Sequence, residues 1–162
     1  MPGSHLRYGR FSKLGQIYLV TSVVQDRQPV FVEFHLGRLL VEELRRAQEQ
    51  ELAQSLAWVV MPDHLHWLFQ LQKGTLSGLI QQVKARSAIA INRARCSNGR
   101  LWQPDFHDQA IRRDQELINM ARYIIANPLR ANLVQYIGDY PLWDAVWLES
   151  TPDASTQYNW LT

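Results

Sequence analysis

The sequence predicts an α+β fold of the ferredoxin-like type, a two-layer sandwich in which helices cover one face of an antiparallel sheet. The expected elements follow the order strand, helix, strand, strand, helix, strand, helix, and no segment is repeated. The chain has 162 residues, of which 46% are hydrophobic and 20% are charged. This length and composition suit one domain with a substantial core and are too small for two.

The first half of the chain predicts one strand, one helix and one hairpin. Residues 16–24 are rich in β-branched and aromatic side chains and end at turn-forming residues, which indicates a strand. Residues 33–51 carry leucines at helical spacing with charges between them, so we expect an amphipathic helix. Two short apolar runs, 55–61 and 64–71, are joined by a Pro-Asp turn and predict an antiparallel hairpin.

The second half predicts a long helix, an irregular strand and a last helix. The long helix begins after Gly74 and stops near residues 96–99, and the strand covers residues 101–111. For the last helix we expect Asp114 as its cap and Pro128 as its end. Its predicted buried stripe consists of Leu117, Ile118, Ala121 and Ile125.

Cysteine content and hydropathy exclude several classes of protein. The single cysteine, Cys96, leaves no disulfide framework and no zinc site built on cysteines. No apolar run approaches the roughly 18 residues that a membrane span needs, and the first residues lack the apolar core of a signal peptide. We therefore expect a cytoplasmic protein with no membrane partner.

The net charge of +2 is unevenly distributed along the chain. Residues 73–113 sum to +6, whereas residues 139–162 sum to −4. Concentrated basic surface is what a polyanion-binding protein needs, and a solvated helix face is the alternative explanation.

His64 and His66 form the first candidate site. In a strand, residues i and i+2 point to the same face, so both imidazoles could share one metal ion while Leu65 points into the core. Two hydrogen-bonded surface histidines would give the same pattern. The Asp and third histidine that a His-x-His-x-Asp-His metallo-hydrolase needs are missing downstream.

Tyr123 and Asn127 form the second candidate site, because residues four apart lie on one face of a helix. Pro128 places Asn127 at the helix end, where its amide is free to reach a ligand. An amphipathic core tyrosine followed by an Asn cap is the alternative. Taken with the two histidines, these residues suggest a divalent-metal site beside a hydroxyl nucleophile, for which a phosphate diester is the natural electrophile.

Three segments, 61–68, 101–108 and 123–134, closely resemble the REP-associated tyrosine transposases. These belong to the HUH single-tyrosine transposases, in which U is a bulky hydrophobic residue, here Leu65. The resemblance extends from about residue 10 to residue 148, which implies a catalytic domain over 1–148 and an acidic tail over 149–162.

The resemblance implies a role for each candidate residue. His64 and His66 would bind a divalent metal, Mg²⁺ or Mn²⁺, with Asn127 as the third ligand, and Tyr123 would be the nucleophile that forms a 5′-phosphotyrosine. His107 and Asp108 are possible accessory residues, although Gln109 departs from the family's acidic-His element.

The resemblance also implies a DNA partner, single-stranded or in hairpins of repetitive extragenic palindromes (REP), and a protein that acts as a monomer, with a dimer as the alternative. Asn132 stands where glycine is more usual, and we expect this to affect only the turn. The candidate phosphate contacts are basic residues of the N-terminal segment and of the +6 region: Arg7, Arg10, Lys13, Lys84, Arg86, Arg93, Arg95, Arg100, Arg112 and Arg113.

Three aromatic side chains, Trp67, Trp102 and Phe106, are candidates for stacking on bases, although we expect at most one or two to stack because tryptophans of a small domain more often belong to the core. The acidic tail is a candidate autoinhibitory segment over the basic surface. A hairpin-binding protein that does not cut DNA is the alternative function, and an RNA-processing role is disfavoured because no RNP-like aromatic motif occurs.

Overall fold

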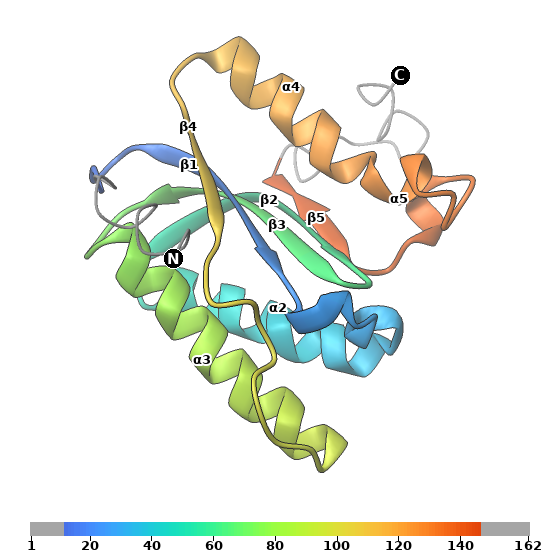
Figure 1. Ribbon diagram of the computed structural model, residues 1–162. Helices are drawn as coiled ribbons and strands as arrows, with labels where there is room; N and C mark the ends of the chain where they lie inside the picture. Colours follow the sequence, from blue (N-terminus) through green and yellow to red (C-terminus); the bar gives the residue numbers. More distant parts are fainter. Residues whose placement is uncertain (1–11, 147–162) are drawn as a thin grey trace.

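The computed structural model describes residues 12–146, which form a five-stranded antiparallel sheet (Figure 1). The spatial order of the strands is β4-β1-β3-β2-β5. The expected α+β class with an antiparallel sheet is confirmed. The strands are β1 Ile17–Val23, β2 Ala53–Met61, β3 His64–Leu71, β4 His107–Ile111 and β5 Trp143–Ala145.

Strand β3 lies at the centre of the sheet and pairs with β1 and β2. The β2–β3 hairpin closes at the predicted Pro-Asp turn, where Met61 pairs with His64. Along β3, alternate side chains enter two different cores. Leu65, Trp67 and Phe69 belong to one core and Leu68 to the other, so the sheet has apolar residues on both faces.

Two helices, α2 (Phe34–Glu49) and α3 (Leu76–Arg95), cover the larger core (Figure 1). The α3 helix ends as predicted at Cys96, which adopts a left-handed conformation with φ 52°. None of the three candidate base-stacking residues is free to stack on a base, since Trp67, Trp102 and Phe106 are at most 7% exposed. The prediction that one or two of them stack is wrong, and the core role that was its alternative holds for all three. Each fills this core, where an indole or phenyl ring gains more from burial than it would on the surface.

Helix α4 (Asp114–Ile125) lies over the opposite face of the sheet, so the helices do not all cover one face as the sequence suggested (Figure 1). Its buried residues are Ala121, Ile124 and Ile125, whereas Ile118 is 39% exposed. The predicted stripe was therefore wrong at Ile118, because the helix turns that side chain away from β2. Asp114 is the first helical residue rather than the cap, a position that still favours an acidic side chain.

The chain bends after α4 and continues in the short helix α5 (Asn127–Arg130). Asn127 therefore begins a helix instead of ending one, since Pro128 is tolerated at a helix start. Asn132 has φ 56°, which confirms that this turn needs the left-handed conformation that glycine adopts freely. Three 3₁₀ turns complete the described fold: η1 Gln25–Arg27, η2 Val30–Val32 and η3 Ile137–Asp139.

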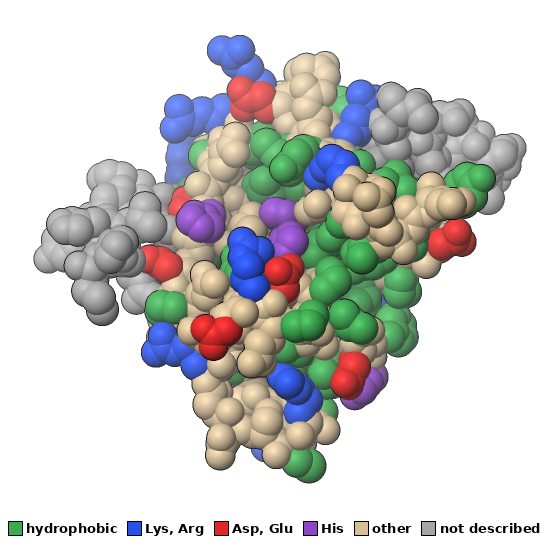
Figure 2. All heavy atoms as spheres, turned by 45° about the vertical axis from the view of Figure 1, so that its right-hand side comes forward, with side chains coloured by type: hydrophobic (Ala, Val, Ile, Leu, Met, Phe, Trp, Pro, Cys, Tyr) green, Lys and Arg blue, Asp and Glu red, His purple; other side chains and the backbone are tan. Residues whose placement is uncertain are grey.

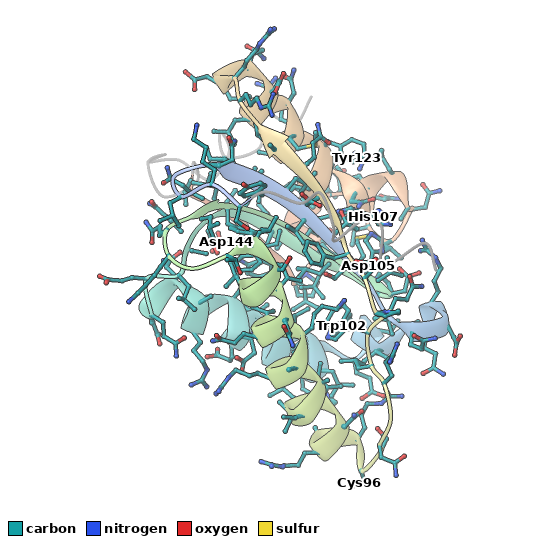
Figure 3. All side chains as sticks on the ribbon, turned by 60° about the vertical axis from the view of Figure 1, so that its left-hand side comes forward. Cys96, Trp102, Asp105, His107, Tyr123 and Asp144 are labelled. Carbon is teal, nitrogen blue, oxygen red and sulfur yellow. The ribbon has the colours of Figure 1, made fainter. Side chains whose placement is uncertain are left out.

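The segment between α3 and β4 is less regular than predicted. Only residues 107–111 form a strand, while Trp102 makes an isolated bridge with Val24. Figure 3 shows this segment running from Cys96 past Trp102 alongside α3, and the Trp102 indole donates to Ser87 Oγ at 3.0 Å. Within residues 12–146, no helix is long and apolar enough to cross a membrane.

Candidate active site

His64 and His66 lie side by side at the start of β3, on the sheet face that α4 covers. Their ring centroids are 4.8 Å apart and the rings are nearly perpendicular. Leu65 is 3% exposed in the core on the other face, as the strand alternation predicted. Figure 2 shows histidine side chains near the middle of one face, with basic and acidic side chains beside them.

His64 is oriented by a carboxylate. Its Nδ1 lies 2.7 Å from Asp63 Oδ1, and Arg27 Nη1 lies 3.2 Å from the other oxygen of Asp63. Partial burial acts to raise the pKa of Asp63, but the hydrogen bond and charge of His64, followed by those of Arg27, outweigh it and lower that pKa. Asp63 is therefore an ionised acceptor, and His64 Nδ1 must carry a proton.

His66 is oriented by a hydroxyl on the neighbouring strand. Its Nδ1 lies 2.7 Å from Thr21 Oγ1, and the two residues are paired across β1 and β3. Burial first, then the charges of His64 and Arg130, lower the pKa of His66 to about 4. The ring is thus neutral at physiological pH, as metal ligation requires.

These contacts leave the Nε2 atoms as the free ligating atoms of the pair. Both Nδ1 atoms are engaged, so Nε2 is the nitrogen of each ring that remains for a ligand, and each ring is held by an orienting partner of the kind that surrounds metal-binding histidines. Within residues 12–146, no three His, Cys, Asp or Glu residues cluster in a way that could hold a metal. The donor set fits a divalent cation whose other ligands are an amide, water or substrate oxygen.

Tyr123 lies on α4 and is 54% exposed, which confirms that it is not a core tyrosine. Figure 3 shows it on this helix, away from the α3 side of the molecule. The guanidinium carbon of Arg130 lies 4.0 Å from the centroid of the Tyr123 ring. Tyr123 therefore comes from the helix that covers the sheet face on which the histidine pair lies.

Asn127 is half-buried and lies between Tyr123 and Arg130 in the chain. Its backbone carbonyl accepts from Ala131, which fixes the first turn of α5. In the described part of the chain its side-chain amide forms no hydrogen bond, and it remains available to a ligand.

The register of the sheet places His107 on the same face as the histidine pair. His107 pairs with Thr21, which in turn pairs with His66, so the three residues form one row across β4, β1 and β3. Side chains in such a row point to the same face. Asp108 is the next residue along the strand and is directed to the other face. The structure thus brings only the histidine of this predicted accessory pair to the site.

The structure divides the predicted phosphate contacts into groups. Lys84 donates to the carbonyls of Gln103 and Asp105 at 2.7 and 2.9 Å, and Arg86 pairs with Glu43 at 3.1 Å, so both help to hold the fold. The α3 residues lie on the face opposite α4. Arg7 and Arg10 lie outside the described residues, and Lys13, Arg93, Arg95, Arg100, Arg112 and Arg113 are exposed.

Sequence reasoning missed three residues of the site: Thr21, Arg27 and Arg130. Thr21 carries no motif, and its role depends on strand pairing. Arg27 is the last residue of the turn η1, which is distant from the hairpin in sequence, and it meets Asp63 only in the folded chain. Arg130 lies within segment 123–134, and its position seven residues after Tyr123 is the signal in the sequence that could identify it.

A central His-hydrophobic-His strand, together with an exposed helical tyrosine over the same sheet face, defines the class of single-tyrosine enzymes that transfer phosphodiesters. Residues 13–127 match the family model described as "Transposase IS200 like", and the chain belongs to this family of tyrosine transposases, which act on DNA by transesterification.

Named relatives agree with this family. The chain is 26% identical over 138 residues to the REP-associated tyrosine transposase of Escherichia coli, covering 83% of this chain and 79% of that protein. It is 28% identical over 149 residues to a Haemophilus influenzae protein named for the same family, covering 83% and 82%.

Two solved structures share the fold. A REP-associated tyrosine transposase bound to a REP hairpin has a TM-score of 0.70 and 24% identity, covering 85% of this chain and 81% of that one. A transposase from Deinococcus radiodurans has a TM-score of 0.52 and 21% identity, covering 84% and 98%.

Proposed function

We propose that this transposase cleaves and rejoins single-stranded DNA beside a palindromic hairpin through a covalent bond to Tyr123. The observation that carries the proposal is the exposed Tyr123 hydroxyl on the same sheet face as two histidines with free Nε2 atoms. The names of the relatives, and the hairpin bound to the structural neighbour, support a hairpin of the REP type as the substrate. Phosphodiester transfer without ATP also fits the absence of a phosphate-binding loop motif from the sequence.

His64, His66 and Asn127 are the residues that would hold the divalent cation, with Mg²⁺ or Mn²⁺ as the proposed ion. When bound, such a cation stabilises the negative charge that develops on the scissile phosphate. Asp63 and Thr21 keep both imidazole rings in the orientation that this requires, since each bonds an Nδ1 atom. His107 extends the polar row and is proposed as an accessory contact to DNA.

The chemical step is a transesterification by Tyr123. Its Oη attacks phosphorus, forms a phosphotyrosine with the 5′ side of the DNA, and releases the 3′ oxygen. The phenol loses a proton and the leaving 3′ oxygen gains one, so the products are a 5′-phosphotyrosine and a 3′-hydroxyl. A 3′-hydroxyl that later attacks the phosphotyrosine reverses these bonds and restores the phenol, and the bond energy is retained between the two steps.

The direct test uses a labelled REP-type hairpin with a single-stranded flank, incubated with the full chain and Mn²⁺. We expect a covalent adduct on denaturing gels that Tyr123→Phe abolishes. Tyr136→Phe is the matched control, because Tyr136 is another exposed tyrosine, 71% exposed, that lies outside the site. Equal cleavage by Tyr123→Phe would refute the mechanism. Hairpin affinity without an adduct in any variant or metal would indicate the alternative, a DNA-binding protein that does not cut.

We further propose that the protein acts as a monomer with its catalytic domain over residues 1–148. The acidic segment 149–162 and its suggested autoinhibitory role lie outside the described residues. Deletion of residues 150–162 tests that role, since unchanged cleavage and unchanged hairpin affinity would refute it.

A further inference from the structure

Arg130 lies beside the candidate active site but has no role in the function proposed above. It comes from α5, yet its guanidinium lies over the ring of Tyr123 on α4, 4.0 Å from the ring centroid. The residue is exposed, and within residues 12–146 its side chain forms no ion pair or hydrogen bond. A stacked cation of this kind contributes about 0.5–1 kcal/mol at an exposed site, which holds the aromatic ring in place.

The backbone fixes where this guanidinium lies. The amide N–H of Arg130 donates to Ala126 at 3.0 Å, and that of Ala131 donates to Asn127 at 2.9 Å. Pro128 is buried, which anchors the short helix against the domain. Side chains on a helix tilt toward its N-terminus, so Arg130 reaches back toward Tyr123.

The guanidinium therefore lies directly beside the proposed nucleophile. No acidic side chain in the described part of the chain neutralises it, although carboxylates pair with other arginines of this protein, as Asp63 does with Arg27.

The guanidinium carbon contacts the face of the Tyr123 ring, and a guanidinium carries five N–H donors, of which this contact occupies none in a hydrogen bond. Two such donors match the geometry of two phosphate oxygens. We propose that Arg130 holds the Tyr123 ring in position for attack and binds the non-bridging oxygens of the scissile phosphate. This inference rests on the function proposed above. In this arrangement one side chain, that of Arg130, contacts both the tyrosine and the scissile phosphate. It thereby aligns the attacking oxygen with the phosphorus.

The test compares Arg130→Ala, Arg130→Gln and Arg130→Lys with the parent in single-turnover cleavage of the hairpin at saturating protein. We expect Arg130→Ala and Arg130→Gln to cleave roughly 100-fold more slowly, the effect of removing one oriented donor from a reacting centre. Arg130→Lys should recover less than a tenth of the parent rate, because an ammonium keeps the charge but neither the planar face nor the fork. Added guanidinium should accelerate Arg130→Ala several-fold and leave the parent unchanged, a response that a merely structural role would not give.

Arg45→Ala is the matched control. Arg45 is an exposed arginine on α2, where it pairs with Glu42 at 3.2 Å on the opposite side of the sheet. We expect the Arg45→Ala protein to cleave the hairpin at the parent rate. Hairpin affinity, measured by fluorescence anisotropy, should change less than threefold in all variants, because one phosphate contact among many is lost.

Cleavage by Arg130→Ala within threefold of the parent rate would overturn the inference and leave the proposed function intact. A loss in Arg130→Ala that added guanidinium does not restore would overturn it as well. If Arg130→Ala does not fold, cleavage by Arg130→Gln within threefold of the parent rate would overturn it in the same way. An inactive parent would instead refute the proposed function itself, so the two failures are distinguishable.

Discussion

Asp63→Asn is the substitution that isolates the orienting contact of the histidine pair. In the structure Asp63 Oδ1 lies 2.7 Å from His64 Nδ1, and its second oxygen lies 3.2 Å from Arg27. An asparagine of the same shape keeps one acceptor but loses the charge, so it holds the His64 ring less firmly and makes Nε2 less basic. Loss of such a partner weakens metal binding about 10–100-fold. This corresponds to about 1.4–2.7 kcal/mol of binding free energy.

The assay is a titration of Mn²⁺ into the full chain by isothermal calorimetry, followed by the Mn²⁺ dependence of the cleavage rate. We expect the Mn²⁺ dissociation constant to rise by the same factor in both measurements, while the rate at saturating Mn²⁺ falls less. Asp26→Asn is the control. Asp26 has φ 57°, a conformation that asparagine also tolerates, and among residues 12–146 its carboxylate makes only a 3.5 Å contact with Gln25. An Asp63→Asn protein that binds Mn²⁺ as tightly as the Asp26→Asn protein would refute the assignment of Asp63 to the metal site.

Two further predictions concern the packing that holds α2 and β2 in place. A methyl group on Gly37 would overlap the side chain of Leu142, which is 2% exposed, so Gly37→Ala should lower the free energy of unfolding by about 1–3 kcal/mol in urea titrations. In a Leu142→Ala background the same change should be neutral or stabilising, and an equal loss there would contradict the packing argument. Tyr140 donates to the Val60 carbonyl, and burial raises its pKa to about 12, so Tyr140→Phe should cost about 1 kcal/mol at pH 7. The unfolded tyrosine ionises near pH 10, whereas the folded one stays protonated up to about pH 12, so the free energy of unfolding of the parent should fall between these pH values. It should fall less in Tyr140→Phe, and an equal fall in both proteins would contradict the burial argument.

The sequence was most informative where local chemistry decides the structure. Alternation along residues 64–71 placed His64 and His66 on one face and Leu65 on the other, because a strand has a period of two whatever its neighbours are. The Pro-Asp turn and the left-handed end of α3 at Cys96 are similarly local. These features follow from a few consecutive residues and were predicted correctly.

Features that depend on how elements pack were predicted less well. The side of the sheet that α4 covers could not be read from its periodicity, because a helix with one apolar stripe fits either face. The error at Ile118 has the same origin, since Ala121, Ile124 and Ile125 form a stripe as regular as the predicted one. Trp102 fits both a base-stacking and a core role by composition, and only its hydrogen bond to Ser87 inside the core decides between them.

The polar row of the site depends on pairing between strands that are far apart in sequence. Thr21, His66 and His107 come from three strands, and their alignment is set by the register of β1 with both neighbours. A shift of one residue in β4 would bring Asp108 to this face in place of His107. The register is specified by the core beneath it, because the same shift would turn Ile111, which is 4% exposed, away from the core that it shares with Leu68. The apolar residues of β4 thus determine which of its polar residues faces the nucleophile. A substitution such as Ile111→Asp should therefore disturb the chemistry of the site as well as its stability.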